Sequence, residues 1–531
     1  MTRSLPAKVS LDLGLDDPED DESLAQRVAR KVGCAREELP QITVIRRTLD
    51  ARRGKTTFHV EVALDPGLVA SEFSAGPMPK EVRLPCRVVI VGDGPAGLFC
   101  AYALARHGVA CTVVDRGKQV RPRRLDLVSV QRMGHVDADS NYCFGEGGAG
   151  TYSDGKLYTR SNKRGNVRDV LAILANHGAP SSILTEARPH IGSNRLPKVI
   201  TALRERLESL GVTFRFGAKV IGLEYVQRGA RRAVRAVRLE GGDGIDADCV
   251  VLATGHSARD VYEWLEREQV RLEAKPFAVG VRIEHPQSLI NRIQYGRFAT
   301  HPKLPNADYH LAYTEDNRGV FSFCMCPGGF IVPAATEEDG VVVNGMSLSR
   351  RDSPYANSGM VVGVEPKFLA HAGYSGNLAG LEFQRRLERA AYRAGGGAFR
   401  APAVRVTDFM AGRISKDLPE CSYQPGLQSA ELAAVLDSGG VPLSTCLRKA
   451  LGVFGEKMRG YVHPDAILVG VESRTSSPLR IPRDLETLQH PDVDGLFPAG
   501  EGGGHAGGIV SAAMDGMRIA EVIAGAIVSS G

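Results

Sequence analysis

The sequence is poor in aromatic residues, in metal-binding motifs and in long apolar runs. Phe, Trp and Tyr make up 6% of the 531 residues, and there is one tryptophan. No HExxH, no Cys and His cluster at metal-ligand spacing and no serine nucleophile turn occurs, so nothing in the sequence supports a metal-dependent or hydrolytic mechanism. The most apolar stretches, 87–115 and 508–527, are interrupted by glycines and charges. They do not fit a lipid-facing span of about 20 residues, and we expect no membrane partner.

Disulfide patterning and a strong charge bias are also missing. The ten cysteines form no CxxC pair and show no regular spacing. No charged-then-apolar leader opens the chain, so we expect a protein of the reducing cytoplasm. The 66 basic and 61 acidic residues leave a net charge of +5, which indicates no nucleic-acid partner. We expect a small-molecule substrate, and the sequence leaves a homo-oligomer open.

The first 80 residues are predicted to form a small α/β unit. An acidic run, 16–22, leads into apolar residues at helical spacing that end at Gly33. Two β-rich runs, 42–49 and 56–64, are joined by residues 50–55 and predict a hairpin. The proline-rich stretch 66–85 is interpreted as a linker. A packing or dimerisation role for this unit and a role in binding a substrate or partner both stay open.

A glycine motif follows the first strongly apolar strand. Residues 87–91 are a continuous β-branched run, typical of a central parallel strand, and a helical pattern begins at Ala96. The amides at the start of such a helix can hold a pyrophosphate. A second apolar strand ends in Asp115, 23 residues beyond Gly92, where a carboxylate should bind ribose hydroxyls. The predicted dinucleotide-binding residues are Gly92, Gly94, Pro95, Ala96, Gly97, Asp115 and Arg116.

Two later glycine segments favour FAD over NAD. Residues 144–151 form a glycine loop suited to pass a flat ring, and 495–501 form a strand that ends in a carboxylate. A carboxylate can hold ribityl hydroxyls, and the helix that follows can stabilise negative charge on a reduced flavin. The predicted flavin-binding residues here are Gly145, Glu146, Gly147, Gly148, Ala149, Gly150, Thr151, Gly500, Glu501, Gly507, Gly508 and Ile509.

The cofactor motifs carry a resemblance to known flavoproteins. Residues 115–117, 253–255 and 498–501 are similar to motifs of the glutathione-reductase-like, two-dinucleotide-fold flavoproteins. Residues 87–520 resemble, more narrowly, a bacterial family of uncharacterised FAD-dependent dehydrogenases. The strings that carry this second resemblance are 144–156, 253–260, 280–286, 323–329 and 472–478. The resemblance implies that Ala253, Thr254 and Gly255 also contact FAD.

The expected fold class is α/β, with a Rossmann-like FAD-binding domain, an inserted α+β substrate domain and a small N-terminal α/β domain. The predicted bounds are 1–80 for the N-terminal domain and 81–270 for the first part of the FAD-binding domain. Residues 271–465 are the predicted substrate domain, and 466–531 return to the FAD-binding domain. Within the substrate domain, β-rich runs at 277–283 and 341–344 and a helix at 381–393 are expected.

His505 is the predicted catalytic residue. The resemblance places it beside the flavin, where the family pattern carries a tyrosine, and imidazole can move a proton near neutral pH. The alternative is a histidine that only packs beside the site. Cys324 and Cys326 are either flavin-facing or redox thiols or, as the sequence favours, structural cysteines. Arg282, Arg474, Arg480 and Arg483 are candidates for binding an anionic substrate.

The direction of electron flow follows from a missing motif. No second GxGxxG with strand and helix flanks occurs between residues 260 and 490. The sequence therefore predicts an FAD-dependent dehydrogenase or oxidase that takes hydride from a C–H next to nitrogen or oxygen. Two alternatives stay open: an NAD(P)H-dependent flavin reductase or monooxygenase, and a non-catalytic FAD-binding regulatory protein.

Overall fold

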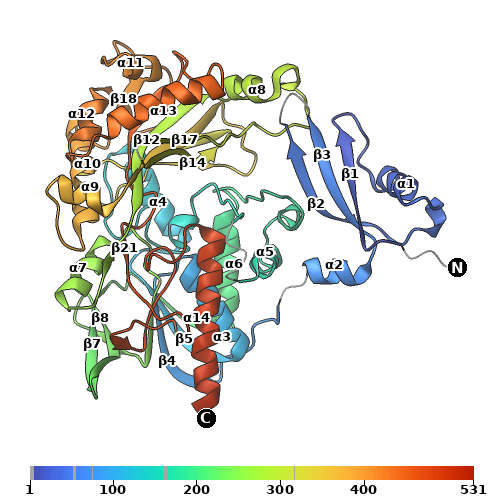
Figure 1. The fold of residues 1–531 in the computed structure, drawn as a ribbon. Coiled ribbons are helices and arrows are strands. Elements are labelled where there is room, and N and C mark those ends of the chain that lie inside the picture. Colours follow the sequence, from blue (N-terminus) through green and yellow to red (C-terminus); the bar gives the residue numbers. More distant parts are fainter. Residues whose placement is uncertain (1–4, 52–55, 74–75, 160–164, 316, 531) are drawn as a thin grey trace.

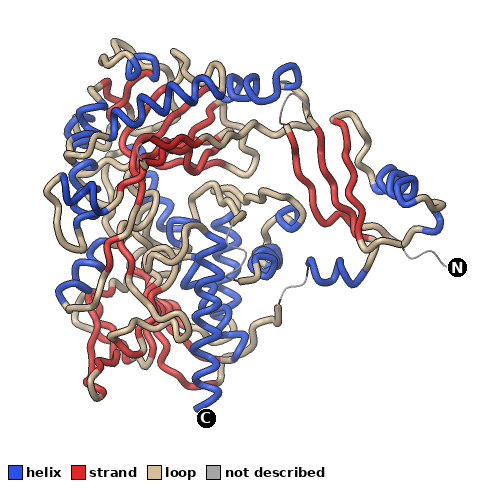
Figure 2. The backbone as a smooth tube through the Cα atoms, viewed as in Figure 1, coloured by secondary structure: helices blue, strands red, loops and turns tan. Residues whose placement is uncertain are grey.

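The computed structural model describes residues 5–51, 56–73, 76–159, 165–315 and 317–530. Three sheets organise these residues: a three-stranded sheet near the N-terminus, a five-stranded sheet and a seven-stranded sheet. Figure 1 shows the N-terminal sheet set to one side, while the two larger sheets lie one above the other. Figure 2 shows that helices and strands both occur throughout the larger part of the molecule. The predicted α/β class is confirmed.

The N-terminal unit packs one helix on an antiparallel sheet. Strands β1 (Lys8–Gly14), β3 (Thr57–Ala63) and β2 (Thr43–Asp50) lie in that order, and helix α1 spans Asp21–Val32. Asp20 caps α1 through the Ser23 amide, and Gly33 ends it at φ 71°. The predicted helix and hairpin are confirmed, although residues 52–55 of the hairpin connection lie outside the described residues. Strand β1 was not predicted.

The linker prediction for 66–85 is partly wrong. Residues Pro66–Phe73 form helix α2. Proline at the first helical position costs no intrahelical hydrogen bond, and the Asp65 carboxylate accepts the amide of Gly67 at 2.8 Å. The following extended segment is attached to the next unit, because the Lys80 amide donates to the Ala105 carbonyl at 3.1 Å. The proline and glycine content of this stretch indicated a linker and did not predict the short helix.

The five-stranded sheet is parallel throughout and has the order β23-β10-β4-β5-β6. Its strands are β4 (Leu84–Val91), β5 (Val109–Asp115), β6 (Thr213–Phe216), β10 (Cys249–Leu252) and β23 (Leu496–Pro498). Helices α3 (Pro95–His107) and α14 (Ile509–Ser530) run side by side along it (Figure 1). Val89, Ile90 and Val91 are buried, as expected of a parallel strand covered on both faces.

Further elements surround this sheet. Helices α5 (Val167–Asn176), α6 (Leu196–Glu208) and α7 (Arg259–Arg267) belong to this part of the chain, whereas α4 (Val120–Arg132) packs its Leu127 and Val130 into the core of the seven-stranded sheet. Beside the five-stranded sheet lies a smaller sheet of β7 (Val220–Arg228), β8 (Arg231–Leu239), β9 (Gly244–Asp246) and β22 (Val493–Asp494). The short strands β11 (Glu273–Ala274) and β21 (Leu479–Arg480) pair with each other.

The seven-stranded sheet forms the upper part of Figure 1. Its order is β13 (Ala312–Glu315), β14 (Arg318–Cys326), β17 (Tyr355–Val364), β12 (Phe277–Pro286), β20 (Ile467–Glu472), β18 (Ala401–Arg405) and β19 (Leu427–Ser429). The pairs are antiparallel except β18 with β19. The predicted strand 277–283 and helix 381–393 are confirmed as parts of β12 and α10 (Ala379–Gly395).

One predicted domain bound is corrected by this sheet. Strand β20 begins at Ile467, beyond the predicted end at 465, yet it pairs with β12 on one side and β18 on the other. A chain segment that returns to fill the middle of a sheet cannot be assigned from local sequence alone. The sheet that contains β12 therefore extends at least to Glu472.

Helices cover the sheet and complete this part of the chain. Those against the sheet include α10, α12 (Leu432–Asp437) and α13 (Leu443–Lys457). The remaining elements are α8 (Gln287–Tyr295), β15 (Gly329–Pro333), β16 (Val343–Ser347), α9 (Pro366–His371) and α11 (Val406–Met410). The predicted β-rich run 341–344 overlaps β16. Of the helices in the described ranges, none has both the length and the apolar content to cross a bilayer.

The contact between α3 and α14 gives a prediction. A Cβ atom on the buried Gly516 would lie 1.9 Å from the Ala96 carbonyl oxygen, whereas one on the exposed Gly525 in the same helix would meet nothing within 4 Å. We expect Gly516→Ala to lower the free energy of unfolding by about 1–3 kcal/mol through overpacking. Gly525→Ala should raise it by about 0.5–1 kcal/mol. Thermal unfolding of both variants measures the difference, and equal effects would contradict the packing.

Candidate active site

The turn after β4 leaves no room for a Cβ atom at two of its glycines, Gly92 and Gly97. Gly92 has φ 102°, and a Cβ atom on it would lie 2.5 Å from the Ala253 carbonyl oxygen. A Cβ atom on Gly97 would lie 2.0 Å from the Gly92 carbonyl oxygen. Gly92 thus makes the turn, and Gly97 lets helix α3 pack on the strand, the two roles expected of these glycines in a dinucleotide-binding turn.

The start of α3 leaves room for a phosphate group. Gly94 is the N-cap of α3, no side chain caps the helix, and Pro95 occupies its first turn. A Cβ atom on Gly94 would meet only the Gly148 Cα, at 4.0 Å, and one on Gly507 would meet nothing within 4 Å. Uncapped helix-terminal amides beside open space suit an anion. The residues of this turn therefore fit the pyrophosphate of FAD.

The predicted glycine segments converge on this turn although they are far apart in sequence. A Cβ atom on Gly148 would lie 3.0 Å from the Gly94 Cα, and one on Gly150 would lie 3.4 Å from side-chain atoms of Pro95 and Ile509. Likewise a Cβ atom on Gly502 would lie 2.7 Å from the Gly255 carbonyl oxygen. Residues 92–97, 145–151, 253–255 and 500–509 thus form one cradle at the carboxyl edge of the parallel sheet.

Asp115 lies at the predicted end of β5 and joins three loops of this cradle. One carboxylate oxygen accepts the Asp93 amide at 3.0 Å, and the other accepts the amides of Gly117 and Gly145 at 2.8 and 3.0 Å. Contact of Asp115 with ribose stays a prediction. Arg116, also predicted to bind FAD, pairs with Asp260, and its Nε lies 3.1 Å from an Asp139 oxygen. Its charge is therefore largely compensated within the chain.

Arg123 holds the glycine loop, and sequence reasoning missed it. This arginine on α4 is fully buried, and its donors bind the carbonyls of Asn141, Glu146 and Gly148 at 2.8 Å each and that of Tyr142 at 3.2 Å. Four carbonyls are thus held by one rigid fork. Its only sequence signal was an arginine in a helix next to a glycine loop.

Glu146 is a structural member of the loop in addition to being a predicted FAD ligand. Its carboxylate accepts the Val120 amide and the Arg204 Nε–H, both at 2.7 Å. The Thr151 hydroxyl donates to the Glu146 carbonyl at 2.8 Å. The side chains of both residues therefore face the protein, and the part of this loop that lies open toward the cradle is its glycine backbone.

Glu501 and His256 are brought together from different loops. The His256 Nδ1 lies 3.7 Å from a Glu501 carboxylate oxygen, and its Nε2 bonds the Arg474 carbonyl at 3.0 Å. Burial raises the pKa of the Glu501 carboxyl, while the charges of His256 and Lys275 oppose this rise. A quarter of the Glu501 side chain is exposed, which suits a residue that meets a bound ligand.

His505 lies on the loop between β23 and α14. Its Nε2 is 3.0 Å from the Ile481 carbonyl oxygen. Burial, and then the positive charge of Arg483, lower the pKa of His505 to about 4. The imidazole is therefore neutral at neutral pH. Its catalytic assignment stays a prediction.

Three of the arginines considered for an anionic substrate are occupied inside the protein. The Arg282 Nη1 donates to both carboxylate oxygens of Glu472, each at 2.8 Å. The Arg474 fork binds Glu388, at 3.0 and 3.2 Å, and Arg483 is paired with Asp515. These ion pairs are buried, so breaking them to bind a substrate would leave buried charges uncompensated. Their role is structural. Arg480 is exposed.

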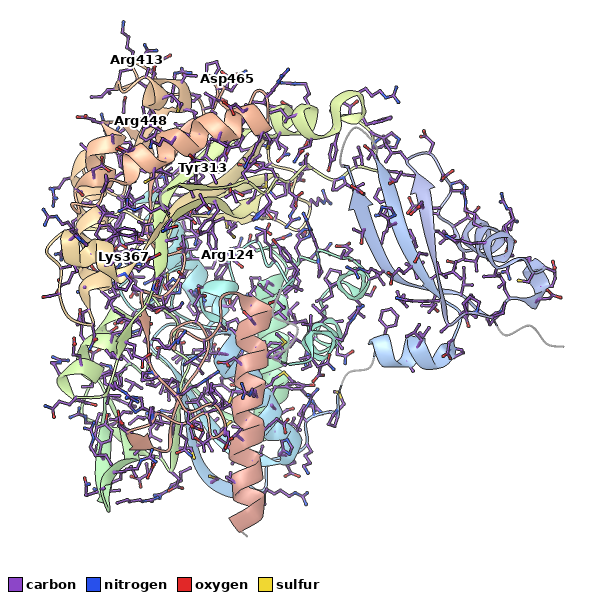
Figure 3. All side chains as sticks on the ribbon, viewed as in Figure 1. Arg124, Tyr313, Lys367, Arg413, Arg448 and Asp465 are labelled. Carbon is purple, nitrogen blue, oxygen red and sulfur yellow. The ribbon has the colours of Figure 1, made fainter. Side chains whose placement is uncertain are left out.

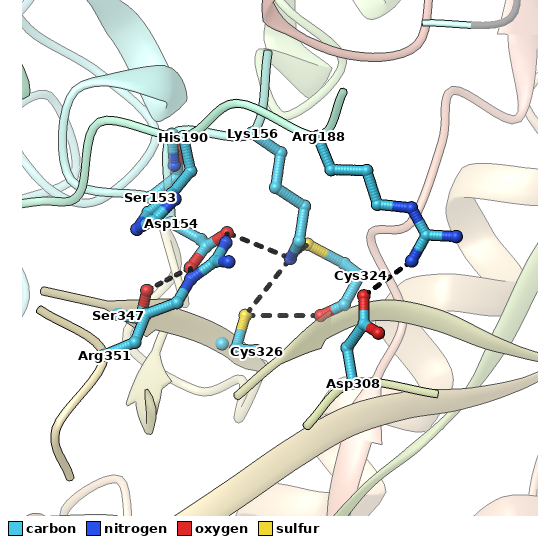
Figure 4. Close-up of polar contacts among 12 residues, drawn as sticks. Ser153, Asp154, Lys156, Arg188, His190, Asp308, Cys324, Cys326, Ser347 and Arg351 are labelled. Carbon is cyan, nitrogen blue, oxygen red and sulfur yellow. Dashed lines mark hydrogen bonds and ion pairs between the residues drawn. The ribbon is translucent and has the colours of Figure 1, made fainter. Parts of the chain in front are cut away.

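A further polar group lies where the glycine loop meets the seven-stranded sheet (Figure 4). We call Asp154, Lys156, Cys324, Cys326 and Arg351 the junction cluster. Lys156 follows the glycine loop, and its Nζ lies 3.5 Å from the Cys324 Sγ and 3.6 Å from the Cys326 Sγ, both on β14. Asp154 lies 3.3 Å from Lys156 and also pairs with Arg351. No motif or spacing in the sequence connects these residues.

The junction cluster and the cradle are electrostatic neighbours. The charge of Cys324 contributes to the raised pKa of Glu501, after burial and against His256 and Lys275. The described residues contain no group of three His, Cys, Asp or Glu side chains placed to bind a metal ion. The chemistry available here is therefore that of a bound FAD, a neutral imidazole, a carboxyl group and two thiols.

The fold and the cradle define the class of protein, an FAD-dependent oxidoreductase. Family comparisons agree: residues 85–132 match the FAD binding domain family, and 192–346 match the FAD dependent oxidoreductase family. Residues 276–475 match the family described as FAD-dependent protein, C-terminal domain-like, and 6–65 match a domain of unknown function. The chain belongs to one family with an uncharacterized protein of Clostridium beijerinckii. The two are 41% identical over 534 residues, covering 97% of each chain.

Weaker similarities were found to one further curated protein and to solved structures. A segment is 28% identical over 172 residues to the flavin-dependent monooxygenase pboD of Aspergillus ustus, covering 32% of each chain. Among solved structures, the flavin-dependent brominase Bmp2 gives a TM-score of 0.36 at 13% identity, covering 83% of this chain and 79% of that one. CtdE in complex with FAD gives 0.32 at 11% identity, covering 84% and 85%. The resemblance to the glutathione-reductase-like subclass stays an expectation.

The role of Arg123 can be tested against its neighbour. Arg123→Met keeps the bulk but removes the donors to four loop carbonyls, so we expect it to lower the free energy of unfolding by about 3 kcal/mol and to reduce the bound FAD. Arg124, labelled in Figure 3, is exposed, and Arg124→Met should change neither quantity. Chemical unfolding and the flavin absorbance of the purified variants measure both. Wild-type behaviour of Arg123→Met would rule out the anchoring role.

Proposed function

We propose that the protein is an FAD-dependent dehydrogenase or oxidase that removes hydride from a C–H bond next to nitrogen or oxygen of a small organic substrate. The substrate would bind at the junction between the cradle and the seven-stranded sheet. FAD, when bound, supplies the hydride acceptor. The chain supplies the binding surface, the orientation of the substrate and a base. That FAD lies in the cradle is supported by the convergence of its glycine segments.

The observation that carries the proposal is the state of His505. A carbonyl oxygen has no hydrogen to donate, so the bond to Ile481 requires the proton on Nε2. The neutral ring then has its lone pair on Nδ1. With a pKa of about 4, this base form dominates at neutral pH. When hydride leaves a C–H next to nitrogen or oxygen, a proton must leave the heteroatom, and a neutral imidazole can take it.

The reverse electron flow is the second candidate. The match to a flavin-dependent monooxygenase over 172 residues favours a scheme in which NAD(P)H reduces the flavin. In that case the organic substrate receives oxygen instead of giving up hydride. The two schemes differ in which compound reduces the flavin, and that difference can be measured directly.

An anaerobic titration separates the candidates. The FAD-loaded protein is mixed with NADPH and, separately, with a panel of amines, amino acids and alcohols, and the visible flavin band is followed. We expect an organic donor to bleach the band and NADPH to leave it unchanged. Bleaching by NADPH alone would contradict the proposal and favour the monooxygenase or reductase. A flavin that stays oxidised with every donor would favour a regulatory FAD-binding protein.

The base can be tested by substitution once a donor is found. His505→Gln keeps an N–H donor at this position but has no basic nitrogen, so we expect kcat to fall about 100-fold or more with FAD still bound. His310→Gln changes an exposed histidine and should keep wild-type kcat. The wild-type rate should not fall as pH drops from about 8 to about 5.5, because His505 is protonated only near pH 4. A decline centred near pH 6.5 would contradict this assignment.

A further inference from the structure

Both thiols of the junction cluster lie close to the ammonium group of Lys156. Figure 4 shows the Lys156 ammonium between the side chains of β14 and Asp154. A β-bulge interrupts the pairing of β14 with β17 between Phe323 and Cys326, and Cys324 has φ 44°. Bulges re-aim side chains and often lie beside active sites, and a positive φ is uncommon for a residue with a Cβ atom. The backbone is thus shaped to present both sulfurs to Lys156.

The charges of the cluster favour one ionised thiol. Lys156 and Arg351 each carry one positive charge. Both contact the carboxylate of Asp154, which carries one negative charge. Nearby, Arg282 pairs with Glu472 and its Nη2 also lies 3.7 Å from the Cys326 Sγ. Burial followed by the charge of Arg351 lowers the pKa of His190 to about 4, which keeps it neutral. The charge of Glu186 also acts on Arg351, so Lys156 is the cation whose charge is left to the two sulfurs. A thiolate on a sulfur beside Lys156 balances this charge.

The two cysteines differ in charge and in access. The pKa of the Cys324 thiol lies well below its usual range, because the neighbouring Cys326 thiol and the charges of Lys156 and Arg282 stabilise its thiolate against the effect of burial. The pKa of the Cys326 thiol is raised by its hydrogen bond with the Cys324 side chain and by burial. Cys324 is half-buried and Cys326 fully buried, while 21% of the Lys156 side chain is exposed. Cys324 is therefore the more exposed residue of the pair.

We propose that Cys324 is a peroxide-reactive thiolate and that Cys326 is the thiol that resolves its oxidised form. This role goes beyond the proposed hydride removal. A thiolate with an adjacent cation and a neighbouring thiol is the arrangement of a redox-active cysteine pair. A hydroperoxide is the substrate class that fits, because it is a two-electron oxidant small enough to reach a half-buried sulfur. A bulky disulfide would need more access than Cys324 offers.

The chemistry balances in two steps. The Cys324 sulfur attacks one oxygen of hydrogen peroxide, an S–O bond forms, the O–O bond breaks, and the departing hydroxide beside Lys156 takes a proton from solvent to give water. The Cys326 sulfur then attacks the Cys324 sulfur, forming the S–S bond and breaking the S–O bond. The second hydroxide leaves with the proton of the Cys326 thiol. The two cysteines are oxidised by two electrons, and the peroxide is reduced to two waters.

The test uses the purified, FAD-loaded protein and about one equivalent of hydrogen peroxide. Peptide and intact mass spectrometry should show a loss of about 2 Da, confined to a Cys324–Cys326 disulfide. Cys326→Ser should instead gain about 16 Da at Cys324 and be trapped by dimedone, since nothing resolves the sulfenic acid. Cys324→Ser should lose the rapid reaction. Cys34→Ser, at a half-buried cysteine of the N-terminal unit, should react like the wild type.

Substitutions of Lys156 give a second test of the proposal. Lys156→Met should slow the reaction with peroxide at neutral pH about 10-fold or more, and Lys156→Arg should restore most of the rate, because the thiolate needs the adjacent positive charge. Flavin absorbance confirms that each variant is folded and loaded. The proposal is overturned if Cys324→Ser consumes peroxide as fast as the wild type, if oxidation falls on other cysteines, or if Lys156→Met keeps the wild-type rate. None of these outcomes depends on the organic substrate or on the role of His505.

Discussion

Backbone must meet backbone without side chains at the carboxyl edge of the parallel sheet, and the rest of the structure depends on this constraint. Gly92 turns against the Ala253 carbonyl, and Gly148 packs beside Gly94. Any Cβ atom at the closest of these contacts would push the segments apart. Side chains from the surrounding fold hold these glycine loops in position. Asp115 ties three loop amides together, and the buried fork of Arg123 holds the carbonyls of the glycine loop.

The distribution of buried charge separates structural residues from reactive ones. Arg282 pairs with Glu472, and Arg474 shares Glu388 with Arg259, which also lies 3.4 Å from Glu337, so these charges join segments of the fold. In the junction cluster Lys156 and Arg351 also share a carboxylate, but Lys156 faces two sulfurs besides. A matched pair holds a structure, whereas an unmatched cation lowers the cost of an anion nearby. For this reason we propose new chemistry for the cluster and not for the arginine forks.

Local sequence predicted the cradle better than its surroundings. The strand, glycine turn, helix and second strand from residue 87 to Asp115 are encoded by adjacent residues, and each was found as predicted. Helix α2 was missed because prolines and glycines in 66–85 resemble a linker, although Pro66 begins a helix. Strand β20 was assigned to the wrong part of the chain because its partners β12 and β18 are distant in sequence.

The same limit applies to side chains that act across the fold. Cys324 and Lys156 are separated by 168 residues, and no periodicity or motif links them. Arg123 binds carbonyls, which have no sequence signature at all. Conversely, three of the four arginines considered for an anionic substrate pair with carboxylates that are distant in sequence. Residue type and spacing can predict a backbone cradle, because backbone geometry is local, but the partner of a charged side chain is set by the tertiary fold.

If the uncapped start of α3 at Gly94 receives the FAD pyrophosphate, filling the space beside it should weaken FAD binding, and titration of FAD into the apoprotein measures this. Gly94→Val fills the open space with little to clash against, since a Cβ atom there meets only the Gly148 Cα at 4.0 Å. Gly452→Val is the control in α13, where a Cβ atom meets nothing within 4 Å. The account predicts that Gly94→Val weakens FAD binding about 100-fold or more while the apoprotein unfolds at its usual temperature. FAD binding by Gly94→Val with the wild-type Kd would contradict it.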